Sequence, residues 1–483
     1  MTQFSDLKPL LPELFLLGSA MLILIVDMFV SERRRGLIYF LSTVAVTLTA
    51  VVTWRAWAEP LPGVILGGIY ARDALGDVLK LFMYLTTVLV YIYAAHGLRV
   101  SGKFRSEFFT LTLLALLGMM VLVSSSHLVT LYLGLELMAL STYALVALDR
   151  DNPEATESAM KYFVLGAMAS GLLLYGISLM YGLTGSLDLT VISAKLASMD
   201  TNSPILALAL IFIVIGVAFK FGAVPFHMWV PDVYQGSHTP VTLFIATVPK
   251  LAAIGMAFRL LPMGLGPLQE HWQDMLAVLA AASLVVGNLA AIVQRNLKRM
   301  LAYSTISHVG FIFMGLVSGQ VSGYGAAMFY VLVYALTTTA AFGMILALAP
   351  GGSDPKAPRF EEIADFRGLN QRKPWYAFLM LLVIASLAGF PPLVGFFAKL
   401  LVLKAAMDGG YLWLALLGGV MAVVGAFYYL RVLKAMYFDE PEQQGELRVV
   451  PEVGVVLSLN ALALLGLGFG FNALLERCLA VWQ

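Results

Sequence analysis

Four ionisable residues lie inside hydrophobic runs that are long enough to span a membrane: Glu136, Lys220, Lys250 and Lys399. A charge at the centre of a bilayer costs about 2.5–3.5 kcal/mol on insertion scales. Such side chains therefore face the interior of a helix bundle, where they mark ion or proton pathways. One acid and three lysines at this depth predict a path for protons or cations.

Glu136 and Lys220 have the chemistry of a proton switch. At a separation of about 4 Å and an effective dielectric near 20, their attraction is worth about 4 kcal/mol. Burial disfavours a charged ammonium by a comparable free energy. Closing or opening the pair would therefore move a proton onto or off Lys220. The structural alternatives are a static salt bridge or a protonated Glu136 bonded to a neighbouring helix.

Four other basic side chains also have a possible role in proton transfer and a structural alternative. Lys250 follows Pro249 in mid-run, too far from either end for snorkelling, whereas Lys399 is nearer an end and snorkelling is its alternative. Lys161 lies one turn inside a run, where it would either snorkel or take up protons. His308, in STISHVGF, can relay a proton near neutral pH, with simple hydrogen bonding as the alternative.

Composition places these residues in a membrane. The chain has 483 residues, of which 60% are hydrophobic and 12% charged, against about 25% charged in a soluble domain. The net charge of +1 argues against nucleic-acid binding. The single Cys478 excludes an internal disulfide, an iron–sulfur site and a thiolate zinc site. His227, His238 and His308 lack a metal-ligand spacing.

No GxGxxG or Walker-type phosphate loop is present, so the energy source is expected outside this chain or in an ion gradient. We expect an all-α polytopic protein with about fourteen spans, each near the ~20 apolar residues that a bilayer requires. Because only Lys8 precedes the first run, we expect a retained helix and not a signal peptide. The expected spans are 9–30, 36–57, 76–97, 107–124, 127–148, 158–182, 203–234, 240–261, 276–294, 299–318, 323–349, 375–407, 411–437 and 452–476.

Spans 203–234 and 375–407 are about half as long again as the ~20 residues of a simple span, and each contains internal Gly and Pro. Proline removes a backbone donor and clashes with the preceding turn, which predicts two discontinuous helices. They are spans seven and twelve, as in two inverted five-helix repeats formed by spans 4–8 and 9–13. The single membrane domain 1–483 would then contain four segments: a three-helix segment 1–106, repeats 107–261 and 276–437, and a last helix 452–483.

Basic residues predict the orientation. Lys80 and Lys404, near span ends, are interpreted as snorkelling. Six basic residues fall in one set of loops: Lys8, Arg55, Arg72, Lys195, Arg259 and Arg477. Eighteen fall in the other set: Arg33, Arg34, Arg35, Arg99, Lys103, Arg105, Arg150, Arg295, Lys298, Arg299, Lys356, Arg359, Arg367, Arg372, Lys373, Arg431, Lys434 and Arg448. The positive-inside rule then puts both termini on the outer side.

Four segments resemble the antiporter-like proton-translocating subunits of respiratory complex I (NADH–quinone oxidoreductase): LYLGLELMALSTYAL, FKFGAVPFHMWVPDVYQGSHTPV, QRNLKRMLAYSTISHVGF and SLAGFPPLVGFFAKLLVL. The resemblance covers essentially the whole chain. One branch of this family has subunits without a long lateral helix. We expect this chain to belong to that branch because of its length, its end after the fourteenth span and its Lys399.

The resemblance implies that Glu136, Lys220, Lys250 and Lys399 form a mid-membrane polar axis joining two half-channels. It implies that quinone reduction elsewhere in the complex drives the proton cycle. NADH, FMN, iron–sulfur clusters and quinone would belong to partner subunits, both membrane and peripheral. The location implied is the bacterial inner (plasma) membrane.

We therefore expect a proton-pumping membrane subunit without redox chemistry of its own. Glu136 would control the protonation of Lys220, Lys250 would link the two halves, and Lys399 would exchange protons with the outer side. Three alternatives remain open at this point. They are a subunit of a cation/proton antiporter, a subunit of a membrane-bound hydrogenase complex, and an interaction protein whose buried charges only hold helices together.

Overall fold

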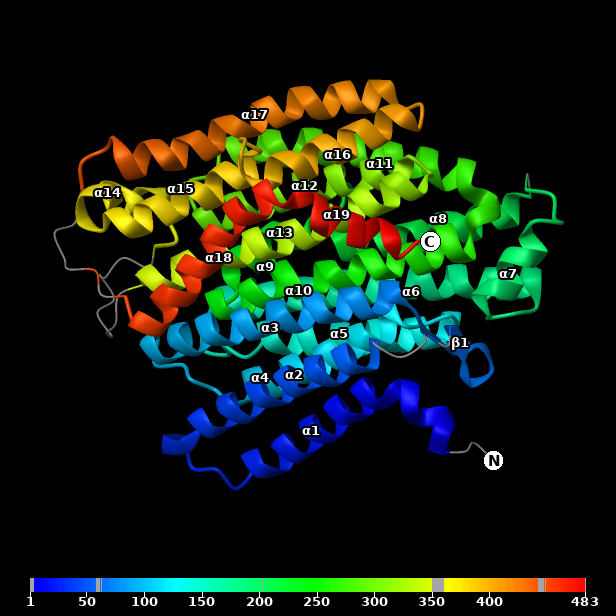
Figure 1. Cartoon of the computed structure of the whole chain (residues 1–483), viewed down its shortest axis with the longest axis horizontal. Helices are drawn as coiled ribbons and strands as arrows, with labels where there is room; N and C mark the ends of the chain where they lie inside the picture. The colour runs from blue at the N-terminus through cyan, green and yellow to red at the C-terminus, as the bar shows by residue number, and fades with distance from the viewer. Residues whose placement is uncertain are drawn as a thin grey trace. The chain divides into compact units, whose positions relative to one another are not determined.

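The computed structural model describes residues 4–57, 61, 63–201, 203–349, 360–441, 447 and 449–482. Within this part the chain is almost wholly helical (Figure 1). Three basic residues used for the orientation, Lys356, Arg359 and Arg448, lie outside the described residues.

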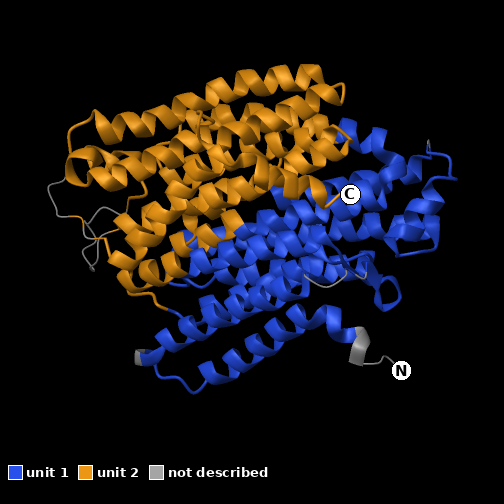
Figure 2. Ribbon diagram, viewed as in Figure 1, with its two compact units in different colours: residues 1–91, 105–221, 248–275 blue, residues 92–104, 222–247, 276–483 orange. Residues whose placement is uncertain are grey.

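The chain forms two compact units, coloured separately in Figure 2. Unit 1 contains residues 1–91, 105–221 and 248–275, and unit 2 contains residues 92–104, 222–247 and 276–483. Helices α3 (Ala74–Val100), α10 (Thr239–Phe258) and α11 (Gln269–Ile292) each contribute residues to both units.

Unit 1 is built from apolar helices, one short hairpin and short turns of helix. Its helices are α1 (Leu11–Asp27), α2 (Gly36–Trp57), α4 (Glu107–Val123), α5 (Leu128–Val146), α6 (Pro153–Thr184), α7 (Leu189–Leu196) and α8 (Pro204–Phe221). Strands β1 (Gly63–Ile65) and β2 (Tyr70–Arg72) form the antiparallel hairpin. The helical turns are η1 (Phe4–Leu10), η2 (Glu32–Arg34), η3 (Leu66–Gly68), the π-helical η4 (Arg259–Gly264) and η5 (Gly266–Leu268).

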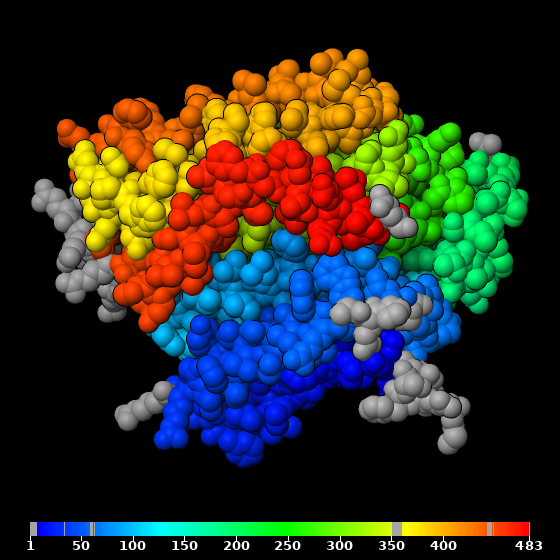
Figure 3. Space-filling view, in the orientation of Figure 1, coloured from blue at the N-terminus to red at the C-terminus, as the bar shows by residue number. Residues whose placement is uncertain are grey.

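Small residues let two of these helices approach closely. A Cβ added at Gly118 of α4 would lie 2.7 Å from the carbonyl oxygen of Gly134 in α5. Helices in a membrane associate through such close backbone packing. The opposite kind of surface occurs on α1 and α2, the blue part of Figure 3, where Leu22 is 63% and Trp54 64% exposed. Apolar side chains exposed in this way suit contact with lipid.

Unit 2 is organised around α13 (Val321–Leu348), whose most apolar stretch is completely buried. The other helices of this unit are α9 (Trp229–Gly236), α12 (Leu297–Val317), α14 (Leu369–Arg372), α15 (Pro374–Ala388), α16 (Val394–Asp408), α17 (Leu412–Tyr437), α18 (Pro451–Phe469) and α19 (Phe471–Ala480), with the turn η6 (Ile363–Phe366).

The two predicted interruptions are present. Helix α8 ends at Phe221 and α9 begins at Trp229, while α15 ends at Ala388 and α16 begins at Val394. Gly222 and Gly389, the first residues after α8 and α15, have φ values of +78° and +86°. Glycine has no Cβ atom and therefore adopts this left-handed conformation without a steric clash. A glycine in this conformation commonly ends a helix, and both α8 and α15 end in this way.

Among the described residues, twelve helices are long and apolar enough to cross a membrane, and α4 and α15 are shorter apolar helices. The prediction of an all-α polytopic fold is therefore confirmed. The count of fourteen spans, the inverted repeats and the four segment boundaries stay predictions. The hairpin β1–β2 and the short helix α7 were not predicted.

Candidate proton-transfer site

Glu136 lies in the middle of α5 and is half-buried. Its Oε1 atom is buried and accepts no hydrogen bond from the described residues. A buried carboxylate oxygen without a donor is unfavourable, because it has lost its hydration without a replacement. Glu136 Oε1 is thus a buried acceptor without a donor in the part of the chain that the structure describes.

Lys220, near the C-terminal end of α8, supplies that nearby cation. It is half-buried, and its Nζ atom lies 5.9 Å from the centroid of the Phe219 ring. Glu136 and Lys220 interact electrostatically, but no ion pair within 4.0 Å joins them in the described chain. The two side chains therefore do not form a direct salt bridge in this structure.

Lys250, in α10, is 1% exposed and binds the end of α8. Its Nζ atom donates to the carbonyl oxygen of Phe221 at 2.7 Å and to that of Lys220 at 3.4 Å. The last carbonyl groups of a helix have no partner within the helix and carry its negative dipole end. The interruption after Phe221 therefore creates the acceptor that holds Lys250.

Lys399 repeats this arrangement in unit 2. It lies in α16, is 8% exposed, and its Nζ atom donates to the carbonyl oxygens of Leu387 at 2.9 Å and Ala388 at 2.8 Å, the last residues of α15. Its burial argues against the snorkelling alternative. In both units a buried lysine thus satisfies the carbonyl end of an interrupted helix.

His308 of α12 is the centre of a hydrogen-bonded group in unit 2. Its Nδ1 atom lies 2.6 Å from the hydroxyl of Tyr330, and its Nε2 atom lies 3.1 Å from the hydroxyl of Tyr429. The Tyr429 hydroxyl is also bonded to Ser304. His308 interacts electrostatically with Lys399, so the imidazole and the ammonium belong to one site. Tyr330 and Tyr429 were not predicted, because their partners come from separate helices.

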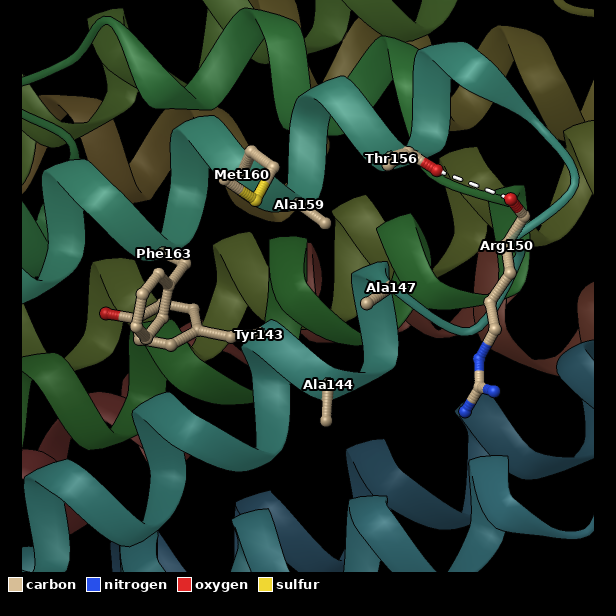
Figure 4. A pocket seen from close by; sticks show the side chains of 8 residues that line it. All are labelled: Tyr143, Ala144, Ala147, Arg150, Thr156, Ala159, Met160 and Phe163. Carbon is tan, nitrogen blue, oxygen red and sulfur yellow. Dashed lines mark hydrogen bonds between the residues drawn. The ribbon is translucent and has the colours of Figure 1, made fainter.

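Lys161 is different, since its side chain is 43% exposed and pairs with Glu157 at 2.7 Å, one helical turn away. The largely apolar cavity nearby, of about 440 Å³, is lined by residues of α5 and α6 and by Ala147 and Arg150 between these helices (Figure 4). None of the predicted proton-transfer residues lines it. Figure 4 shows the guanidinium of Arg150 pointing away from Met160 and Phe163.

Two snorkelling predictions have opposite outcomes. Lys404 is exposed, as snorkelling requires. Lys80 is 1% exposed and lies 2.5 Å from Glu13, so its prediction is wrong. The sequence contained one overlooked signal: Glu13 is itself an acid within an apolar helix, and a buried lysine needs such a partner.

Comparison with known proteins identifies the family. Residues 125–425 match the family described as "NADH:quinone oxidoreductase/Mrp antiporter, TM", a range that contains every predicted proton-transfer residue. NADH-quinone oxidoreductase subunit N from Thiobacillus denitrificans is 52% identical over 471 residues, which cover 97% of this chain and 96% of that protein. The chain belongs to the NADH-quinone oxidoreductase subunit N family.

Solved structures agree with this assignment. A chain of respiratory complex I from Thermus thermophilus with bound aureothin matches with a TM-score of 0.81 at 32% identity, covering 96% of this chain and 98% of that one. A chain of the Mrp complex from Dietzia sp. DQ12-45-1b shares the fold, with a TM-score of 0.84 at 21% identity, and covers 99% and 97% of the two chains. The prediction of an antiporter-like membrane subunit of complex I is confirmed, with other subunits of that complex as partners.

Proposed function

We propose that this chain moves protons through Glu136, Lys220 and Lys250 in unit 1 and through His308 and Lys399 in unit 2. The observation that carries this proposal is the pair of buried lysines bound to the carbonyl ends of interrupted helices. An amine at the carbonyl end of a helix is buried in a low-dielectric environment, which disfavours its positive charge. The negative end of the helix dipole favours the same charge. The opposing effects suit a group that must both gain and release a proton.

The cycle begins at Glu136. When its carboxylate approaches Lys220, the ammonium is stabilised and Lys220 keeps its proton. When the carboxylate withdraws or is itself protonated, Lys220 releases the proton, and Lys250 is the amine bound to the carbonyl of the same residue. Lys250 then passes the proton towards the second half of the chain.

In unit 2, Lys399 is the group that exchanges a proton with the outer side. His308 acts as its relay, because both ring nitrogens lie within hydrogen-bonding distance of tyrosine hydroxyls. Lys161 has a lesser role as a group for proton uptake on the inner side. Its exposure and its pairing with Glu157 suit a residue in contact with water or with lipid headgroups.

Quinone reduction in partner subunits drives this cycle, and NADH, FMN, iron–sulfur clusters and quinone are bound there. The chain itself carries out no redox chemistry. It lies in the bacterial inner (plasma) membrane with both termini on the outer side, an orientation supported by the excess of basic residues in one set of loops.

Replacement of Lys220 by Ala tests the proposal in the assembled complex. NADH-driven proton uptake into vesicles should fall by about a hundredfold, the lower end of what a positioned acid–base group contributes. Lys404→Ala, at an exposed lysine outside the proposed path, is the control. Normal proton pumping by an assembled Lys220→Ala complex would refute the proposed role.

A further inference from the structure

A second cluster of buried charges lies in unit 1 and shares no residue with the proton path proposed above. It contains Glu13 of α1, Tyr70 and Arg72 of β2, and Asp77 and Lys80 of α3. Each of the five is 5% exposed or less. Ionisable groups inside apolar helices are expensive to bury and are typical of functional sites.

Three of these groups form a closed ring of hydrogen bonds. The Lys80 Nζ atom lies 2.5 Å from Glu13 Oε1 and donates to the Tyr70 hydroxyl at 3.0 Å. The Tyr70 hydroxyl in turn donates to the same Glu13 oxygen at 2.8 Å. Burial raises the pKa of Tyr70 to about 12, so the phenol keeps its proton and remains a donor to the carboxylate. An ammonium, a phenol and a carboxylate in direct contact provide a ready path for proton transfer.

Two oxygens of the cluster accept no hydrogen bond from the described residues: Glu13 Oε2 and Asp77 Oδ2, both buried. The Nε atom of Arg72 lies 3.7 Å from Asp77 Oδ2, and another nitrogen of Arg72 donates to the backbone carbonyl of Ala56. An ionised oxygen without a donor pays its full desolvation cost, whereas protonation removes the charge. The cluster therefore contains two buried carboxylate oxygens that lack a hydrogen-bond donor among the described residues.

The charged groups around the cluster are already paired. Arg259 donates to both carboxylate oxygens of Asp73, at 2.5 and 2.7 Å, and its Nε atom donates to the carbonyl of Val123 at 2.9 Å. Burial raises the pKa of Asp73, but Arg259 outweighs this effect and holds the pKa below its usual range. Tyr84, the remaining titratable neighbour, has its hydroxyl 3.3 Å from that of Thr53. The Asp73–Arg259 pair is thus a permanent ion pair beside an exchangeable group.

We infer that Glu13, Tyr70, Asp77 and Lys80 form a second proton-exchange site in this chain. The cycle starts with Lys80 and Asp77 protonated and Glu13 ionised. A proton passes from the Lys80 ammonium to the Glu13 carboxylate, which leaves a neutral amine and a neutral acid. Glu13 then releases that proton, and Lys80 recovers one from protonated Asp77, one helical turn away. Asp77 finally takes up a proton from the medium, which restores every group to its starting charge.

The inference rests on the proposed function, because proton exchange is useful only in a chain that moves protons. The test is the double variant Glu13→Gln/Lys80→Met in the assembled complex. Removing both partners of a buried ion pair leaves no unpaired charge and is often neutral for stability. We expect normal assembly, a loss of proton pumping per NADH of about a hundredfold, and a changed pH profile of pumping.

The matched control is Asp73→Asn/Arg259→Met, which removes the neighbouring permanent ion pair. It should leave the pH profile of pumping unchanged. If the two double variants changed the rate and the pH profile of pumping equally, the cluster would only support the fold. Normal pumping by Glu13→Gln/Lys80→Met would also overturn the inference.

Lys80→Arg provides a second measurement that does not depend on the double variant. Arginine keeps the positive charge and can bond Glu13, but it does not release a proton in proteins. We expect an assembled complex with pumping reduced by about a hundredfold; full pumping would overturn the inference. Lys220→Ala is measured in parallel. Impaired pumping in Lys220→Ala together with normal pumping in Lys80→Arg would reject only the second site. Normal pumping in Lys220→Ala would reject the proposed function itself.

Discussion

At the scale of single residues, Lys250 and Lys399 do the same structural task in different units. Each Nζ atom donates to two consecutive carbonyl groups at the end of a helix. These carbonyls would otherwise be buried polar groups without a partner, which cost about 1–3 kcal/mol each. The lysines therefore stabilise the interruptions at the same positions where we propose that they transfer protons.

Replacing Lys399 by Ala should consequently affect both stability and pumping. We expect the free energy of unfolding to fall by about 2–6 kcal/mol, because two buried carbonyl groups lose their hydrogen-bond donor. We also expect reduced proton pumping. Lys404→Ala, on the same helix α16 but exposed, is the matched control and should change neither. The measurement is thermal unfolding of the purified complex alongside vesicle acidification. Equal melting temperatures for the two variants would contradict this reading of the Lys399 contacts.

The tyrosine partners of His308 give a second prediction. Tyr330→Phe removes the hydroxyl that lies 2.6 Å from His308 Nδ1 and leaves the rest of the ring in place. We expect the rate of proton pumping to fall and its pH profile to shift, because the imidazole loses the partner that fixes its orientation. Tyr334→Phe is the control, since the Tyr334 hydroxyl bonds Thr305 and not His308. An unchanged pH profile in Tyr330→Phe would argue that His308 has only a packing role.

Asp188 gives a pH-dependent prediction outside the membrane spans. Burial raises the pKa of Asp188, but hydrogen bonds from Thr190 and Val191, at the start of α7, outweigh burial and lower it. Because the folded pKa lies below the unfolded value of about 3.9, the stabilisation is complete above that pH. It is lost as the pH falls through the folded pKa.

We therefore expect the protection of the α7 amides, relative to their intrinsic exchange rates at each pH, to fall in strong acid, and hydrogen exchange measured against pH would show this. Asp188→Asn should keep the cap and remove this acid dependence, whereas Asp188→Ala should destabilise α7 by about 0.5–2 kcal/mol at neutral pH. Acid-dependent exchange that persists in Asp188→Asn would assign the effect to another group.

At the scale of elements, the positions of the helix interruptions were predictable and their internal geometry was not. Gly and Pro within an apolar run indicate a break, and both breaks are where the sequence predicts them. The lysine contacts could not be predicted, because they depend on which carbonyls a neighbouring helix presents. Spacing along the chain gives no information about that.

Gly389 connects the break in unit 2 to its lysine. Its φ of +86° strains any other residue, and an added Cβ would lie 2.9 Å from Lys399 Cδ. Gly389→Ala should therefore destabilise the protein by about 1–2 kcal/mol from the backbone alone, with a further cost from Lys399. Gly410, with a φ of +88° and no atom within 4 Å of an added Cβ, supplies the matched control. If unfolding measurements give the same loss for both alanine variants, the contact with Lys399 contributes nothing.

At the scale of the whole molecule, composition and periodicity predicted the membrane class, and four motifs predicted the family. The paired charges of Glu13 and Lys80 were missed, because Lys80 was interpreted alone, from its distance to a span end. Only the fold shows that α1 brings an acid to within 2.5 Å of it. The inverted repeats rest on helix order and remain a prediction.

Orientation is a prediction at this scale, and it has a direct test. Single cysteines introduced at Arg150 and Lys195, in a Cys478→Ser background, should react with a membrane-impermeant thiol reagent from opposite sides of the membrane. The inner side should label Arg150→Cys, because the excess of basic residues lies in its set of loops. Labelling of Arg150→Cys from the outer side of intact cells would reverse the predicted topology.

The contacts of Lys250 and Lys399 also determine how little must move when a proton leaves. An ammonium carries three hydrogens and a neutral amine carries two. A deprotonated lysine can therefore still donate to both carbonyls, and its new lone pair is left to receive the next proton. In the proton cycle that we propose, the charge on each lysine would alternate while its hydrogen bonds to the helix end persist. Such a cycle would need little reorganisation of the protein, which is favourable for fast and repeated transfer.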